Sequence, residues 1–176
     1  MVVTIASGKV KGIEQEGTMA FLGIPYAKVE RFMPPMPVDK WDTVRVCDHW
    51  GPQAMQNTGG RQLSEDEMSE NSCVLNVWTT DCSAKKPVML WLHGGGFDSG
   101  TSAWNPGWGL AKNDVVSVSI NHRLNILGFL DLSACSDKYK QSGNVGMLDV
   151  VAALEWIKQN ISQFGGDPGN VTVFGE

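Results

Sequence analysis

The sequence predicts an α/β fold in which helices cover a parallel β-sheet, and three consecutive stretches carry this prediction. Residues 114–120 are rich in β-branched side chains and indicate a strand, and residues 171–174 indicate another. Between them, one face of a helix collects the apolar side chains Met147, Val150, Val151, Leu154, Ile157 and Ile161. A strand, a helix and a strand in this spacing form a βαβ unit, whose strands run parallel.

The first half of the chain predicts shorter elements. Residues 2–24 alternate apolar and polar positions between glycines, which suggests two or three short antiparallel strands. The prolines of residues 31–37 exclude a helix there, and residues 38–70 are mostly polar and turn-like. Residues 74–80 and 88–92 indicate two further strands.

In the second half of the chain, the sequence also indicates where the helices begin and end. A short helix is expected to run into Leu110-Ala111, and Asn144 is expected to cap the long helix. Gly165-Gly166, with Pro168 behind them, are expected to end that helix. No linker divides the chain, so residues 1–176 are expected to belong to one domain.

Composition excludes several classes of protein. The chain has 176 residues, a formal charge of -5 and no basic patch, so we expect no nucleic-acid partner. No apolar run approaches the roughly 20 residues that span a membrane, and the N-terminus does not resemble a signal peptide. The four cysteines are scattered, which favours free thiols in a reducing compartment. The three histidines lack metal-ligand spacing, so no metal or other cofactor is expected.

The segment His93-Gly94-Gly95-Gly96-Phe97 is the strongest functional signal, because three glycines follow a buried strand. Bare backbone N–H groups at such a position suit an anion. A phosphate loop requires a lysine before Thr101, and a dinucleotide fingerprint requires a glycine one residue earlier than Gly100; both requirements fail. A tight turn without a ligand and a cradle for an oxyanion remain as interpretations.

The end of the sequence favours the oxyanion. Residues 171–174 form a strand, and Gly175-Glu176 match the first two positions of a Gly-x-Ser-x-Gly nucleophile elbow. A glycine loop after another strand supplies the oxyanion hole opposite such an elbow. We therefore expect a serine after Glu176.

With these features, the sequence resembles the type-B carboxylesterases, the cholinesterase-like branch of the α/β-hydrolases. The resemblance is strongest to bacterial members such as the p-nitrobenzyl esterases. The matching segments are residues 21–27, 31–37, 75–78, 93–100, 121–123, 160–168 and 171–176. The resemblance implies an α/β-hydrolase fold in which small antiparallel strands precede a mostly parallel central sheet. It implies that residues 1–176 are the N-terminal part of one catalytic domain, which needs the remainder for a complete fold.

The resemblance also assigns roles to residues near the glycine loop. Gly95 and Gly96 match the family's oxyanion-hole donors, and Glu176 matches the acidic residue beside the nucleophile. Gly94 and Phe97 match positions that contact substrate. Two tryptophans, Trp104 and Trp108, are expected either to line the substrate pocket or to serve only in packing.

Two structural ion pairs are implied as well, one between Arg31 and Glu70 and one between Arg123 and Asp149. Where many secreted relatives carry a disulfide, this chain has Ala54 and Ser72. The absence of both cysteines of that disulfide favours a cytoplasmic protein.

The implied activity is the hydrolysis of small-molecule carboxylic esters through an acyl-enzyme. The family's serine, acid and histidine would all follow residue 176, so residues 1–176 alone are expected to be inactive. The alternative is a non-catalytic, cholinesterase-like binding or adhesion protein. A serine after Glu176 would favour the enzyme, whereas glycine or alanine would favour the alternative.

Overall fold

The computed structural model describes residues 1–57 and 67–175 of the chain. Within them, the central sheet has six strands in the order β11-β9-β10-β8-β4-β3. The strands are β3 (Ile13–Gln15), β4 (Thr18–Pro25), β8 (Val74–Thr79), β9 (Lys86–Leu92), β10 (Val116–Ile120) and β11 (Gly166–Gly175). Strand β9 pairs in parallel with both β10 and β11, while the other pairs are antiparallel. The sheet is therefore mixed, with its parallel part at β11, β9 and β10.

The N-terminal region folds into two antiparallel hairpins, as the glycine breaks predict. Strand β1 (Val2–Ile5) pairs with β2 (Gly8–Lys11), and β3 pairs with β4, so there are four short strands where two or three were expected. Strand β5 (Val44–Val46) joins β2, and β6 (Gln53–Ala54) pairs with β7 (Met68–Ser69). The polar stretch before β8 thus contains only short strands among its described residues.

Three α-helices connect the later strands. They are α1 (Trp108–Ala111), α2 (Asn125–Phe129) and α3 (Val145–Asn160). Short 3-10 turns lie at Ser102–Trp104, Asp137–Tyr139, Ser142–Asn144 and Ile161–Phe164. Among the described residues, none of the helices combines the length and apolar character needed to cross a membrane.

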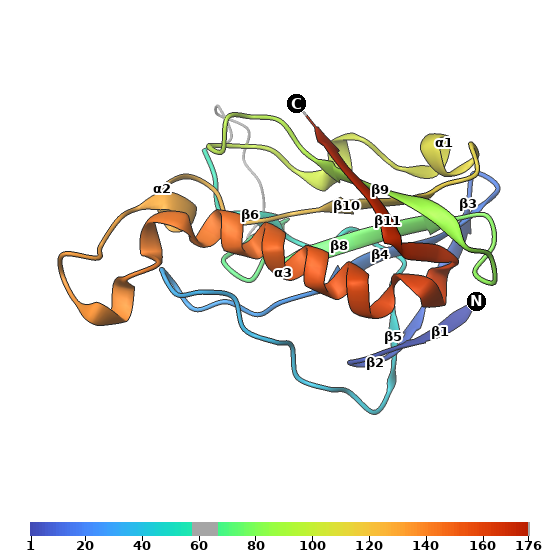
Figure 1. The fold of residues 1–176 in the computed structure, drawn as a ribbon, viewed down its shortest axis with the longest axis horizontal. Coiled ribbons are helices and arrows are strands. Elements are labelled where there is room, and N and C mark those ends of the chain that lie inside the picture. Colours follow the sequence, from blue (N-terminus) through green and yellow to red (C-terminus); the bar gives the residue numbers. More distant parts are fainter. Residues whose placement is uncertain (58–66, 176) are drawn as a thin grey trace.

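Helix α3 lies across one face of the sheet (Figure 1). The predicted βαβ unit is confirmed, since β10 leads through the short α2 to α3 and then to β11. Both strands belong to the parallel part of the sheet, with β9 between them. Beneath α3, Phe21 of β4 is fully buried and meets Phe164 edge-on, with ring centroids 4.9 Å apart. Such a pair adds about 0.5–1.5 kcal/mol to the stabilisation from burial alone.

The other face of the sheet carries a smaller apolar cluster. Residues alternate across a strand, so Ala20 and Leu22 of β4 point away from Phe21 and meet Trp78 and Ala111. Trp108 packs against this cluster, and α1 is thereby held on the face opposite α3.

Two expectations for α3 are wrong in detail. Val151 is 48% exposed, because the buried face turns toward Ala153 and Trp156 instead, while Ile157 is buried as predicted. Asn144 occupies the N-cap position, but its side chain accepts no capping hydrogen bond. Gly165 ends the following turn with φ 78°, a left-handed conformation that favours glycine, as predicted.

Candidate active site

The glycine loop and the predicted elbow begin at the same edge of the sheet. Strands β9 and β11 run parallel, and their register pairs Gly175 with Leu92, the last residue before His93. A Cβ atom on Gly175 would lie only 2.3 Å from the Leu92 carbonyl oxygen, so glycine permits this close approach. The next residue, Glu176, lies outside the described residues, and its predicted place beside the nucleophile stays a prediction.

The backbone of the loop requires glycine at Gly95. Its φ is 115°, and an added Cβ atom would lie 2.1 Å from the carbonyl oxygen of Ser99. The Gly95 carbonyl accepts hydrogen bonds from the amides of Asp98 and Ser99, which closes a tight turn. Gly96 also has a positive φ, 62°, but open space surrounds the position of its missing Cβ.

Two adjacent N–H groups are left available by this turn. Gly95 and Gly96 are exposed, and within the described part of the chain neither amide donates a hydrogen bond to a protein group. Successive amides in such conformations form a concave site that binds anions. A negatively charged oxygen is the ligand that this arrangement suits.

Two residues from distant segments, Gln56 and Asn125, hold the loop. Gln56 accepts a hydrogen bond from the Gly100 amide at 2.7 Å and donates one to the Gly100 carbonyl at 2.9 Å. The backbone amide of Asn125 donates to the Phe97 carbonyl at 2.7 Å, and the Asn125 side chain donates to the Met55 carbonyl, also at 2.7 Å. Sequence reasoning missed both residues, because their hydrogen-bond partners lie in distant segments of the chain.

His93 lies beneath the loop and is buried. Its Nδ1 atom lies 2.9 Å from the Gly94 carbonyl oxygen, so Nδ1 donates to it. The imidazole stacks on that of His122, with ring centroids 5.0 Å apart and planes 2° apart. Burial lowers the pKa of both imidazoles below the ordinary value, which favours their neutral forms. Gly100 is essential to this packing, because a Cβ atom there would lie 2.2 Å from His93 Nδ1.

The three aromatic residues expected near the substrate, Phe97, Trp104 and Trp108, lie in different environments. Phe97 is 55% exposed and packs on Phe129 at a centroid distance of 5.3 Å. It lines an open pocket of about 430 Å³ that also includes Gly96, Ile126 and Leu130. Trp104 is exposed at the surface, whereas Trp108 packs into the small cluster beside α1. The packing interpretation therefore applies to Trp108 in this structure.

The two implied ion pairs are both present, but their environments differ. Arg123 donates from Nε and Nη2 to the Asp149 carboxylate at 2.9 and 2.7 Å, and both side chains are buried. Arg31 also reaches Glu70 with two nitrogens, yet the Arg31 side chain is exposed. Hydrogen bonding from Arg31 lowers the pKa of the Glu70 carboxyl. Arg123 also donates to the Met33 carbonyl at 2.7 Å and so ties the proline-rich segment to the sheet.

Comparisons with known proteins extend over the whole chain. A model of the Carboxylesterase family matches residues 1–176. Para-nitrobenzyl esterase from Bacillus subtilis (strain 168) is 42% identical, over 99% of this chain and 38% of its own length. Carboxylesterase 1F from Mus musculus is 40% identical, over 99% of this chain and 35% of its own length.

Solved structures give the same result. A carboxylesterase from Geobacillus stearothermophilus superposes with a TM-score of 0.92 at 45% identity, over 99% of this chain and 37% of its own. A PNB esterase superposes with a TM-score of 0.91 at 39% identity, over 100% of this chain and 38% of its own. The architecture is that of the N-terminal part of an α/β-hydrolase. The chain thus spans 35–38% of the length of these relatives.

Proposed function

This chain belongs to the carboxylesterase family, and from that membership we propose that it forms the N-terminal part of a serine carboxylesterase domain. The observation that carries the proposal is the pair of available amides at Gly95 and Gly96. They lie at the edge of the sheet where β9 and β11 both end. An anion cradle at this position suits acyl transfer, because that reaction develops negative charge on a carbonyl oxygen.

In the proposed reaction, the serine expected after Glu176 attacks the carbonyl carbon of an ester. A histidine beyond this chain takes the hydroxyl proton, and the carbonyl oxygen becomes an oxyanion that accepts hydrogen bonds from Gly95 and Gly96. The tetrahedral intermediate collapses, the alcohol leaves with the proton, and a serine ester remains. Water then attacks that ester with the same base and releases a carboxylic acid. Loss of one oxyanion donor typically lowers the rate by a factor of about 10²–10³.

The neighbouring residues take supporting roles in this proposal. Glu176 stabilises the elbow through hydrogen bonds, and Gly94, Phe97 and the exposed Trp104 face the substrate. The substrate is a small-molecule ester, and the reaction calls for no metal, nucleic acid or membrane. We also propose a bacterial protein that resides in the cytoplasm. The four free cysteines and the bacterial relatives support this, although mammalian relatives also match.

The test is ester hydrolysis by the full-length protein that contains this chain. We expect saturable hydrolysis of p-nitrophenyl acetate, which alanine in place of the serine after Glu176 abolishes. Ser162→Ala is the matched control, because Ser162 is exposed on the turn after α3. A protein without that serine, or one whose hydrolysis survives its removal, would contradict the proposal. The first of these results would favour the binding or adhesion protein.

A further inference from the structure

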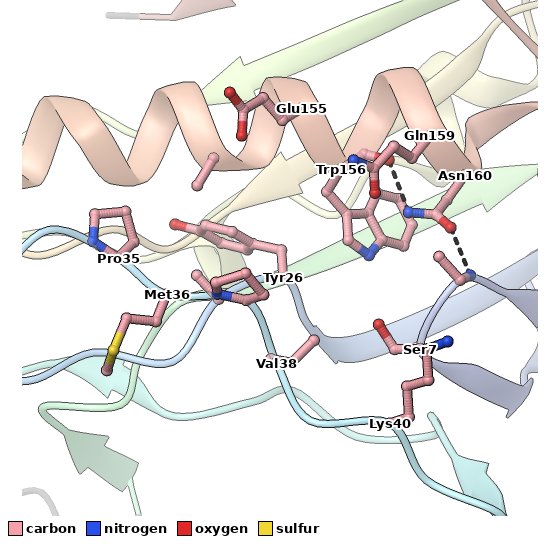
Figure 2. A pocket seen from close by; sticks show the side chains of 14 residues that line it. Ser7, Tyr26, Pro35, Met36, Val38, Lys40, Glu155, Trp156, Gln159 and Asn160 are labelled. Carbon is pink, nitrogen blue, oxygen red and sulfur yellow. Dashed lines mark hydrogen bonds between the residues drawn. The ribbon is translucent and has the colours of Figure 1, made fainter.

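A second pocket lies between α3, the turn after β1 and the proline-rich segment (Figure 2). Its volume is about 270 Å³, a little below the roughly 300–1,000 Å³ of sites for drug-sized ligands. The walls are mainly apolar and include Tyr26, Pro35, Met36, Val38, Ala152 and Trp156. None of the lining residues belongs to the glycine loop, so this pocket is separate from the candidate active site.

Internal hydrogen bonds fix two polar walls of this pocket. The Tyr26 hydroxyl donates to the Asn121 carbonyl at 2.7 Å. Asn160 accepts from the Ala6 amide at 2.8 Å and donates to the Trp156 carbonyl at 2.9 Å. The bond between Asn160 and Ala6 holds the β1 turn against α3. The pocket is therefore built by the fold, and these two side chains have no need of a ligand.

The Trp156 indole is the exception. The residue is only 5% exposed, and its Nε1 atom has no hydrogen-bond partner among the described residues. Figure 2 shows the indole nitrogen directed toward the space beside Val38 and Ser7. An indole N–H is a donor only, so the missing partner is an acceptor. A buried water usually has two to four polar partners, and the neighbouring Tyr26 and Asn160 side chains are already engaged.

A positively charged side chain, that of Lys40, lies at the rim of the pocket. Lys40 is exposed there and forms no salt bridge within the described part of the chain. Glu155 is also on the rim, so net charge alone does not select the ligand. Selection comes from the apolar walls and from the buried, unpartnered N–H of Trp156. We propose that this pocket binds a small carboxylate with an apolar body, whose oxygen accepts from Trp156 and pairs with Lys40.

The test uses benzoate as the probe and the full-length protein labelled with 5-fluorotryptophan. A Trp156→Phe variant assigns the fluorine signal of Trp156, and benzoate is expected to shift this signal saturably. Calorimetry then gives the affinity. Trp156→Phe should weaken it about tenfold to a hundredfold, because a hydrogen bond to a charged acceptor is lost. Lys40→Gln should weaken it about twofold to fivefold, as for an exposed ion pair.

Matched controls separate this site from the proposed active site. Lys158→Gln removes a lysine on the exposed side of α3, outside the pocket, and should leave the affinity unchanged. Benzyl alcohol keeps the ring and an oxygen but lacks the charge, so it should bind more weakly than benzoate. Binding that leaves the Trp156 signal unmoved, no binding at all, or equal binding of the alcohol would overturn the inference. The readouts are the Trp156 fluorine signal and the affinity for benzoate, not ester hydrolysis. A catalytically inactive protein would therefore still show whether this pocket binds a carboxylate.

Discussion

The buried ion pair between Arg123 and Asp149 leads to a stability prediction whose size follows from burial. Asp149→Asn keeps the shape of the side chain but removes its charge. The guanidinium of Arg123 then stays in the interior with only neutral acceptors, namely the amide oxygen of the new side chain and the carbonyls of Glu30 and Met33. Burial alone disfavours the charged guanidinium, and in the intact pair the bonds and charge of Asp149 keep the pKa of Arg123 raised.

The expected loss of stability follows from comparing this buried ion pair with the exposed pair of Arg31 and Glu70. The Arg123 and Asp149 side chains are 4% and 0% exposed, so removing one partner leaves an uncompensated buried charge and costs about 3–5 kcal/mol. The Arg31 and Glu70 side chains are 59% and 36% exposed. The charge lost in Glu70→Gln is screened by water, so that variant should cost about 0–1 kcal/mol.

Urea denaturation of the full-length protein, followed by tryptophan fluorescence, measures both variants. The free energy of unfolding should fall by several kcal/mol for Asp149→Asn and remain nearly unchanged for Glu70→Gln, with similar slopes against urea. Equal losses for the two variants, or a loss below about 1 kcal/mol for Asp149→Asn, would refute the reasoning from burial.

Three further predictions concern the glycine loop. Gly95→Ala should lower kcat/KM for p-nitrophenyl acetate by about 10²–10³, and by more than Gly96→Ala, because only the Gly95 Cβ atom would clash with the backbone. Gln56→Ala leaves the buried Gly100 backbone groups unpaired and should lower the free energy of unfolding by about 1–3 kcal/mol in urea titrations. Burial lowers the pKa of His93 and His122 below the ordinary 6.5, so between the folded and unfolded pKa values the unfolded chain binds more protons. Stability should therefore fall as the pH drops below about 6.5, by at most about 2.7 kcal/mol per pH unit for the two groups.

Each of these predictions has a contrary result. Equal kinetic losses in Gly95→Ala and Gly96→Ala would show that the clash at Gly95 does not control the loop. An unchanged urea midpoint for Gln56→Ala would remove Gln56 as its anchor. For the histidines, an equally steep pH dependence in a His122→Phe variant would assign the slope to other groups.

Local patterns in the sequence were sufficient for most of the fold. The strands at residues 74–80, 88–92 and 171–174 are recognisable from their apolar and β-branched runs, which are typical of strands whether buried, as in β8, or at the sheet edge, as in β11. The glycine loop was recognisable because glycine supplies a backbone freedom that no other residue has. Its proposed role with Gly95 and Gly96 stays a prediction until the oxyanion contact is measured.

What the sequence did not reveal depends on contacts between distant segments. Gln56 lies 44 positions before Gly100, and nothing near either residue signals their hydrogen bonds. The misplaced helix face has a similar cause. An apolar pattern alone placed Val151 inside, whereas the fold buries Trp156 beside the N-terminal turn and exposes Val151. Side-chain contacts of this kind are set by the tertiary arrangement rather than by local periodicity.

The most direct measurement is a crystal structure of the full-length protein after reaction with a dialkyl p-nitrophenyl phosphate. Such a reagent would leave a phosphoryl group on the proposed serine, as a stand-in for the tetrahedral intermediate. We expect a phosphoryl oxygen about 2.7–3.1 Å from the amide nitrogens of both Gly95 and Gly96. A phosphorylated serine whose oxygen lies away from these two amides, or a protein that takes up no phosphoryl group, would contradict it.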